Sequence, residues 1–276
     1  MNITFLGTSA ATPTKERNLP AIALRLNSGE LILFDAGEDV QRRFEAAKLK
    51  FNTPTTIFIS HMHGDHVIGL PGLLFNFHLN DRTAPLVIIG PQGLASFLNA
   101  HYFYIGLKAQ TYDLVLYEVE IPEVIAKSYR ENTPLNQEND QKMRLIEYRN
   151  LLSSQYERRF IAKDNNILWQ TTEYQVFCEW MPHSTPTLGF RFEELPRDGK
   201  FDPEKAKALG IPMGALWKQM QEGKIVKLKD GREINPVQEG IVTEKRPGYT
   251  IVYTADTGIG PILTDFVRNT DILISE

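Results

Sequence analysis

The feature that most constrains the fold is a segment that places three imidazoles and a carboxylate within six residues. This segment is His61-Met62-His63-Gly64-Asp65-His66, and it directly follows the apolar run Thr56–Ser60. A β-branched run that ends in glycine and aspartate, and then resumes as Val67–Leu70, is typical of a strand, a tight loop and a helix. The sequence therefore predicts that these polar side chains lie at the carboxyl end of a buried strand.

The spacing within this segment is that of a metal site. Residues two apart in an extended stretch point the same way, so His61 and His63 can share one ion, while Asp65 and His66 lie past the turn and can reach a second ion. Two adjacent ions would clamp a phosphodiester or acyl group and activate a water for attack at neutral pH. We therefore expect a hydrolase.

Packing alone is a poor explanation for this pattern, because half of the six histidines of the chain lie in these six positions. A lone histidine is more often a satisfied core or surface residue than a ligand. His78 and His101 lie in helix-like segments and fit that interpretation, so we leave both out of the predicted site.

Two metals need more ligands than one loop supplies. His183 follows the predicted strand Tyr174–Trp180, and Asp256 follows the predicted strand Ile251–Tyr253. Taken alone, His183 could cap a turn and Asp256 could be an ordinary helix N-cap. Beside a metal loop that requires partners, the ligand interpretation is favoured for both, and an aspartate can bridge two ions with its two oxygens.

Composition limits the class of protein. The chain has 276 residues with 42% hydrophobic content, which suits one compact αβ domain. A single cysteine, Cys178, excludes an intrachain disulfide, favours a reducing compartment and leaves nitrogen and oxygen as the metal ligands. A net charge of −4 argues against a globally basic nucleic-acid binder but leaves room for local basic surfaces. With no bilayer-length apolar run and no signal-peptide pattern at Met1–Leu6, we predict a soluble, cytoplasmic protein.

Strand and helix patterns alternate along most of the chain, which predicts a layered α/β (α+β) core. Residues 127–164 interrupt the alternation with a polar stretch, and we interpret them as an insertion with a helix over Met143–Leu152. Residues 193–240 are rich in glycine and proline and form a second interruption, either an excursion with a task or disorder. The expected strands are 3–7, 21–26, 31–34, 86–90, 174–180, 250–254 and 271–276, and the expected helices are 40–48 and 94–101.

Together, the His61–His66 segment, Asp35 in Phe34-Asp35-Ala36-Gly37, His183 and Asp256 resemble the metallo-β-lactamase superfamily. Within it, Pro13-Thr14-Lys15-Glu16-Arg17-Asn18 is similar to the Pro-x-Lys-x-Arg-Asn loop of short-form ribonuclease Z (tRNase Z), which trims the 3′ end of precursor tRNA. Segments 183–190 and 210–217 are also similar to that family. The resemblance implies a four-layered αβ/βα sandwich over residues 1–276, with residues 193–240 as a projecting arm that grips the tRNA body.

The resemblance also assigns roles to the residues. His61, His63 and His183 would hold a first Zn²⁺, Asp65 and His66 would contribute to a second, and Asp256 would bridge the two. Asp65 would also be the catalytic general base, and Asp35 would steady the metal loop through hydrogen bonds without touching zinc. Lys15, Arg17 and Asn18 would contact RNA, because lysine and arginine neutralise phosphates and asparagine can pair with a base edge. The family further implies a homodimer.

This sequence departs from the family pattern at its end. The family continues past the position of Glu276 into a His-Ser-Thr segment and a final histidine that completes the second zinc site. We therefore expect this chain to lack the family's C-terminal segment and to hold its second Zn²⁺ with an incomplete ligand set. Histidine and aspartate also suit manganese or iron, so the sequence does not decide the physiological metal.

The sequence leaves two other functions open. A phosphodiesterase of the same superfamily acting on small nucleotides would use the same metal site, but it would need neither the Pro13–Asn18 loop nor the arm. A catalytically silent RNA-binding module would follow if the missing C-terminal histidine is genuine.

Overall fold

The computed structural model describes residues 1–107, 111–135, 143–153, 156–163 and 167–276. The chain divides into two compact units. The first unit consists of residues 1–168, 177–191 and 251–276, and the second consists of residues 169–176 and 192–250. Residues 136–142, 154–155 and 164, which belong to the predicted insertion, lie outside the described residues.

An eight-stranded sheet forms half of the first unit, and its strand order follows the chain order from β1 to β8. Strands β3 to β6 run parallel to one another, while β2 and β3, two of the predicted strands, form an antiparallel hairpin. Because parallel strands end at the same edge of a sheet, the loops that follow β3, β4 and β5 meet there. The strands are β1 (Asn2–Gly7), β2 (Ala21–Arg25), β3 (Leu31–Phe34), β4 (Thr55–Phe58), β5 (Leu86–Pro91), β6 (Leu114–Val119), β7 (Arg144–Arg149) and β8 (Glu157–Ala162).

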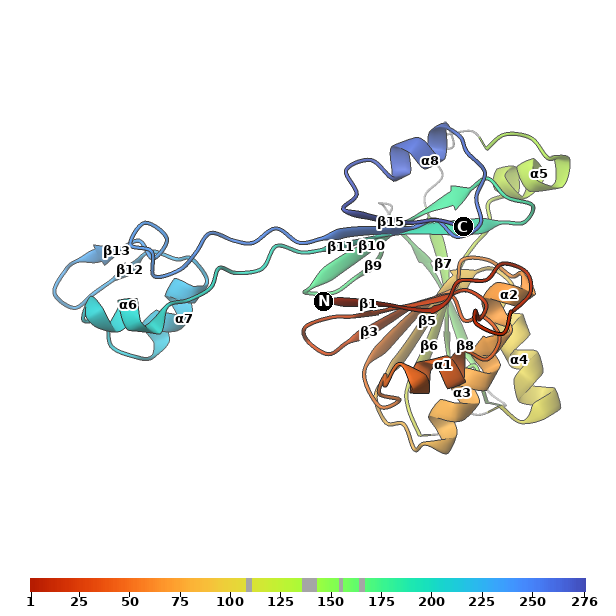
Figure 1. Ribbon diagram of the computed structural model, residues 1–276, viewed down its shortest axis with the longest axis horizontal. Coiled ribbons are helices and arrows are strands. Elements are labelled where there is room, and N and C mark those ends of the chain that lie inside the picture. Colours follow the sequence, from red (N-terminus) through yellow and green to blue (C-terminus); the bar gives the residue numbers. More distant parts are fainter. Residues whose placement is uncertain (108–110, 136–142, 154–155, 164–166) are drawn as a thin grey trace. The chain divides into compact units, whose positions relative to one another are not determined.

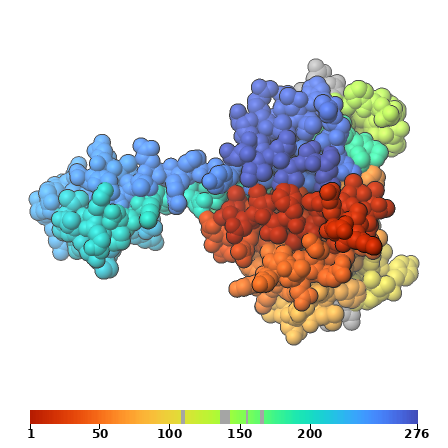
Figure 2. Space-filling view, viewed as in Figure 1, coloured from red at the N-terminus to blue at the C-terminus, as the bar shows by residue number. Residues whose placement is uncertain are grey.

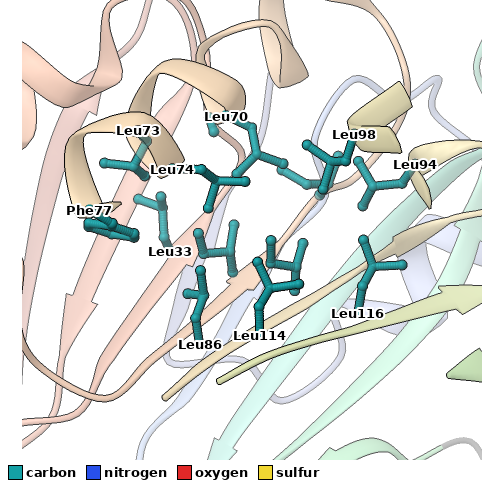
Figure 3. Close-up of a cluster of buried hydrophobic side chains, with 14 of the residues drawn as sticks. Leu33, Leu70, Leu73, Leu74, Phe77, Leu86, Leu94, Leu98, Leu114 and Leu116 are labelled. Carbon is teal, nitrogen blue, oxygen red and sulfur yellow. The ribbon is translucent and has the colours of Figure 1, made fainter. Parts of the chain in front are cut away.

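Helices cover the outer face of this sheet. These are α1 (Val40–Ala46), α3 (Gly69–Leu79) and α4 (Leu94–Ile105), and the short α2 (Gly64–Val67) precedes α3. Leucines of α3 and α4 pack onto leucines of β3, β5 and β6, as Figure 3 shows for Leu74, Leu98 and Leu116. Each fully buried side chain of this size contributes about 1.5–3 kcal/mol to folding. This core fixes the strands whose ends carry the candidate site.

A second sheet faces the first, with the strand order β15-β14-β11-β10-β9. Phe190 of β11 lies 5.9 Å from Phe34 and 5.3 Å from Phe58, measured between ring centroids, so the two sheets pack face to face. Figure 1 shows α5 and α8 on the far side of this sheet and α1, α3 and α4 beyond the other. The predicted αβ/βα sandwich is therefore confirmed. The elements are β9 (Ile167–Gln170), β10 (Tyr174–Met181), β11 (Thr187–Glu194), β14 (Thr250–Tyr253), β15 (Ile272–Ile274), α5 (Glu123–Glu131) and α8 (Pro261–Phe266).

The second unit has a small core of its own, although its sequence is irregular. It contains α6 (Pro203–Ala208), α7 (Ala215–Gln221), β12 (Val226–Lys227) and β13 (Glu233–Ile234). The Asp202 side chain caps α6 by accepting hydrogen bonds from the backbone N–H groups of Glu204 and Lys205. Met220 is fully buried there, and the Trp217 indole donates to the Ile211 carbonyl oxygen. The predicted role of residues 193–240 as a projecting arm stays a prediction.

The predicted helix over Met143–Leu152 is wrong, because residues 144–149 form β7. On one side β7 pairs with β6, which is remote in sequence. On the other side it pairs with β8, the next strand along the chain. Glu147 is buried on this strand, where Tyr117, Arg149 and Arg159 satisfy its carboxylate. Tyr117 and Arg159 lie outside the local window from which periodicity is judged.

Cys178, the only cysteine of the chain, is buried on β10, where it packs as a small apolar side chain. Burial raises the pKa of its thiol above the ordinary value, which keeps it protonated at neutral pH. Within the described residues, each helix is too short or too polar to cross a bilayer.

Candidate metal centre

Two loops at the carboxyl edge of the large sheet are held together by backbone hydrogen bonds. The N–H of Ala36 donates to the His66 carbonyl oxygen at 2.8 Å, and the N–H of Gly69 donates to the Ala36 carbonyl oxygen at 3.0 Å. A Cβ atom on Gly69 would lie 1.9 Å from the Gly37 carbonyl oxygen, so this close approach requires glycine. The loop after β3 and the predicted metal loop after β4 thus form one rigid platform.

Four of the predicted ligands converge above this platform. The ligand atoms of His61, His63, His183 and Asp256 all lie within 4.8 Å of one another. His63 Nδ1 lies 3.0 Å from His61 Nε2 and 3.3 Å from His183 Nε2, while Asp256 Oδ2 lies 3.6 Å from His183 Nε2. A tetrahedral zinc with bonds of about 2.0–2.1 Å holds its ligand atoms about 3.3 Å apart. The donor set and its spacing therefore fit a zinc-sized ion.

A second group shares Asp256 with the first. His66 Nε2 lies 3.6 Å from Asp256 Oδ1 and 3.8 Å from Asp65 Oδ2, and the Glu276 carboxylate completes a group with His66 and Asp256. His66 Nε2 is buried without a hydrogen-bond partner. A buried polar atom without a partner is rare in proteins, and a cation bound at this position would be the missing partner of His66 Nε2. The two Asp256 oxygens face different groups, as a bridging ligand requires.

Asp35 sets the tautomers of two of these histidines. Its Oδ2 accepts hydrogen bonds from His66 Nδ1 at 2.8 Å, Ser60 Oγ at 2.8 Å and Tyr253 Oη at 2.6 Å, and its Oδ1 accepts from the Ser60 N–H at 2.7 Å. Because the Ser60 hydroxyl donates to Asp35, its oxygen accepts from His61 Nδ1 at 3.0 Å. Both imidazoles therefore carry a proton on Nδ1 and present the Nε2 atom toward the site.

The charges around Asp35 follow from burial and from these contacts. Burial opposes ionisation of Asp35, but the imidazole of His66 and the hydrogen bonds lower its pKa below the ordinary value. Burial and the charge of His66 lower the pKa of His61 to about 4, so His61 is neutral at pH 7. Burial lowers the pKa of His66, but the Asp35 carboxylate outweighs it and raises that pKa to about 10. In the metal-free protein His66 therefore carries the proton that a metal ion would replace.

Tyr253 and Glu276 belong to this centre, although the sequence did not identify them. Tyr253 Oη donates to Asp35 and lies 3.1 Å from Glu276 Oε1, and burial raises the pKa of Glu276 to about 7. Both residues lie on or just after strands of the second sheet, which are far from Asp35 in sequence. Their only sequence signal is position, since Tyr253 ends an apolar strand and Glu276 follows one, as Asp256 does.

Of the predicted RNA-binding residues, Lys15 and Arg17 are exposed in the loop between β1 and β2. The loop is locally ordered by a turn in which the Thr14 N–H donates to the Arg17 carbonyl oxygen at 2.8 Å and Thr14 Oγ1 accepts from the Arg17 N–H at 2.9 Å. Figure 2 shows the N-terminal residues, in red, on the surface of the first unit. Both cationic side chains are thus open to solvent.

The same loop is attached to the metal loop. The N–H of Ala11 donates to Asp65 Oδ2 at 2.9 Å, which orients the carboxylate next to His66. The Asn18 side-chain amide donates to the carbonyl oxygens of Glu38 and Asp39, at 3.3 and 3.5 Å. Asn18 therefore holds the base of the loop in this structure, a task that the sequence did not suggest for it.

Comparisons with known proteins agree with this arrangement. The chain is 33% identical over 278 residues to the ribonuclease Z of Synechococcus sp. (strain CC9605), covering 100% of this chain and 74% of that protein. It is 34% identical to the ribonuclease Z of Prochlorococcus marinus (strain MIT 9301), covering 100% of this chain and 75% of that protein. The crystal structure of human tRNase Z, short form, superposes with a TM-score of 0.53 and 29% identity over 70% of this chain and 65% of that one. A family profile described as Anti-Pycsar protein Apyc1 matches residues 1–113.

Proposed function

This chain belongs to the ribonuclease Z family of metallo-β-lactamase-fold hydrolases, and from that premise we propose how its own residues cut precursor tRNA. It is a metal-dependent endoribonuclease of tRNA 3′ processing. The observation that carries the assignment of the site is the convergence of His61, His63, His183 and Asp256 at the sheet edge. Similarity to ribonucleases Z over the whole of this chain favours this function over a small-nucleotide phosphodiesterase or a silent RNA-binding module.

We assign two Zn²⁺ ions to the site. His61, His63 and His183 would hold the first, Asp65 and His66 would contribute to the second, and Asp256 would bridge them. When bound, the ions would polarise the scissile phosphate and lower the pKa of the attacking water. Support for the pair comes from the two groups of ligand atoms that share Asp256 and from the unpartnered His66 Nε2.

Individual side chains of the protein have separate roles in the reaction. Asp65 lies beside His66 and orients the attacking water, whose proton it accepts as general base. The water oxygen bonds to phosphorus, the bond from phosphorus to the 3′ oxygen breaks, and that oxygen takes up a proton. The products are a tRNA with a 3′-hydroxyl and a trailer with a 5′-phosphate. Asp35 keeps His61 and His66 in the tautomers that ligation requires.

RNA contacts outside the centre complete the proposal. Lys15 and Arg17 would neutralise phosphates of the acceptor end, and Asn18 would contribute a base contact or hold the loop in place. Residues 193–240 would act as the arm that grips the tRNA body, which is supported by their own compact core. A homodimer is the assembly that the family resemblance favours, and the cytoplasm is the proposed location.

The test is cleavage of a precursor tRNA labelled at its 5′ end, by the unaltered protein and by Asp65→Ala. We expect one cut that leaves a 3′-hydroxyl after the discriminator position, and a loss of about 10²- to 10⁴-fold in rate for Asp65→Ala. Retained tRNA binding with no cleavage by the unaltered protein would show that the enzyme assignment is wrong. Cleavage of small cyclic or linear nucleotides alone would favour the phosphodiesterase.

A further inference from the structure

A cavity of about 670 Å³ in the first unit is not explained by the metal centre alone. Three segments line it: part of residues 128–135 at the end of α5, residues 182–184 after β10, and residues 259–262 at the start of α8. Its volume lies within the range of about 300–1,000 Å³ that is typical of small-molecule sites. It is therefore large enough for a specific ligand group.

This cavity borders the metal centre through one shared residue. His183 lines the cavity, and its Nε2 also lies 3.3 Å from His63 Nδ1 and 3.6 Å from Asp256 Oδ2. A group that occupies the cavity would therefore lie next to the position of the scissile phosphate. When the substrate is RNA, the group next to the scissile phosphate belongs to one of the two nucleotides that flank the cleaved bond.

The lining suits a flat, neutral group. Leu135, Pro182 and Ile262 supply apolar surface, while Asn132 and Ser184 supply hydrogen-bonding groups. Among the residues that line the cavity there is no aspartate, glutamate, lysine or arginine. A phosphate would find no cationic partner here other than a histidine that already belongs to the metal centre. A nucleobase, with two apolar faces and a polar edge, matches this lining better.

Tyr129 is the aromatic residue of the lining, and its ring is held in place. Its hydroxyl donates to the Met181 carbonyl oxygen at 2.6 Å and accepts from the Thr187 N–H at 3.2 Å. Both bonds attach α5 to strands of the second sheet, so the ring is fixed before a ligand arrives. Single-stranded RNA is commonly bound by stacking of its bases on such side chains.

We propose that this cavity receives the base of a nucleotide adjoining the scissile phosphate, with Tyr129 as its aromatic platform. The inference rests on the proposed function and extends it, because it adds a base-binding subsite to the metal centre. It also gives a role to residues 128–135, which lie in the predicted insertion of residues 127–164. The base belongs either to the last nucleotide of the mature tRNA or to the first nucleotide of the trailer.

A filled cavity provides the first test. Ser128 lines the cavity, whereas its neighbour Lys127 on the same helix is exposed and does not. Ser128→Trp should lower kcat/KM for precursor tRNA by about 5- to 100-fold, the range expected for the loss of one stacked base. It should leave hydrolysis of bis(p-nitrophenyl) phosphate, which has no base, within about twofold. The matched variant Lys127→Trp should leave both activities unchanged.

Modified substrates provide a second test, whose main comparison uses the unaltered protein and so does not depend on the folding of a variant. Precursor tRNAs that lack the base at one or the other flanking nucleotide are cleaved by the unaltered protein and by Ser128→Trp. One of the two substrates should lose about 5- to 100-fold with the unaltered protein, and on that substrate Ser128→Trp should cause no further loss. This also identifies which of the two bases is bound.

The outcomes separate the two proposals. If the unaltered protein does not cleave precursor tRNA at all, the proposed function is wrong. If it cleaves precursor tRNA but both abasic substrates are cleaved as fast as the intact one, the cavity does not bind a base. Equal losses for Ser128→Trp and Lys127→Trp, or an equal loss on the small phosphodiester, would likewise overturn the inference.

Discussion

The metal-bearing unit and the second unit differ in how their residues are fixed. In the first, 29 buried residues form one cluster, whereas the second has a cluster of eight. Asp35, His61 and His66 are fully buried, and hydrogen bonds determine the orientation of each. The second unit has short elements and surface ion pairs such as Lys207–Glu204, which contribute little to stability.

This difference fits the proposed division of labour between catalysis in the first unit and tRNA binding in the second. Chemistry on a phosphodiester needs ligands held to within a fraction of an ångström, and only a large core supplies that rigidity. Gripping the body of an RNA needs surface area and tolerates a smaller, less stable unit. We therefore expect changes at the metal centre of the first unit to affect all substrates alike and changes in the second unit to affect only tRNA.

The largest effect should come from removing the metal. Chelation should abolish cleavage of both precursor tRNA and a small phosphodiester, and added Zn²⁺ should restore both. Because Asp35 holds the pKa of His66 at about 10, that histidine is protonated at neutral pH and must lose its proton on binding. Metal affinity should therefore rise about tenfold per pH unit from pH 6 to 8, as measured by calorimetry. An affinity that does not change with pH would exclude His66 as a ligand.

The next largest effect should come from Asp35→Asn. The amide places an N–H group where the carboxylate accepts, either toward Ser60 N–H or toward His66 Nδ1 and Tyr253 Oη. We expect a loss of about 10- to 100-fold in metal affinity and a parallel loss on both substrates at limiting metal. Glu38→Gln, an exposed neighbour, is the control. A loss restricted to tRNA would contradict the proposed role of Asp35.

Creating a cavity in the core of the second unit should separate precursor tRNA cleavage from small-phosphodiester hydrolysis. Met220→Ala removes the fully buried side chain of α7 and should destabilise this unit by about 2–5 kcal/mol. Precursor tRNA cleavage should fall, while small-phosphodiester hydrolysis should persist. Gln219→Ala, at the exposed neighbouring position, should change neither. Hydrogen exchange would show whether the protection lost is confined to residues 192–250.

The smallest effect should come from Lys15→Ala. This residue lies in the first unit, as the metal centre does, yet it should contribute to RNA binding alone. We expect KM for precursor tRNA to rise roughly three- to tenfold and the salt dependence of binding to weaken by about one ion. Hydrolysis of the small phosphodiester should not change. Arg17→Ala should behave in the same way, and a loss on the small substrate would place this loop in the catalytic machinery.

The sequence predicts the metal loop well because its signal is local. The spacing of His61, His63 and His66 after an apolar run depends only on strand geometry, and the position of Asp256 after a buried strand follows the same logic. The sandwich also follows from alternating strand and helix patterns. These features require no knowledge of distant partners.

What the sequence misses depends on contacts between remote residues. Tyr253 and Asp35 lie 218 positions apart and are joined by a single hydrogen bond, which no periodicity reveals. Likewise, the local pattern of residues 144–149 predicts a helix, whereas pairing with β6 and β8 makes this segment a strand. The family resemblance predicts an RNA contact for Asn18, and the sequence gives no sign that the carbonyl oxygens of Glu38 and Asp39 accept its amide protons.

The division of labour has one direct test, the excision of residues 198–245. Arg197 and Arg246 form an isolated antiparallel bridge, with each N–H donating to the carbonyl oxygen of the other at 3.0 Å, so a Gly-Ser-Gly linker can join them. For the excised protein we predict a rise of about tenfold or more in KM for precursor tRNA, through lost phosphate contacts, with kcat/KM for bis(p-nitrophenyl) phosphate unchanged. Equal losses on the two substrates would contradict the account.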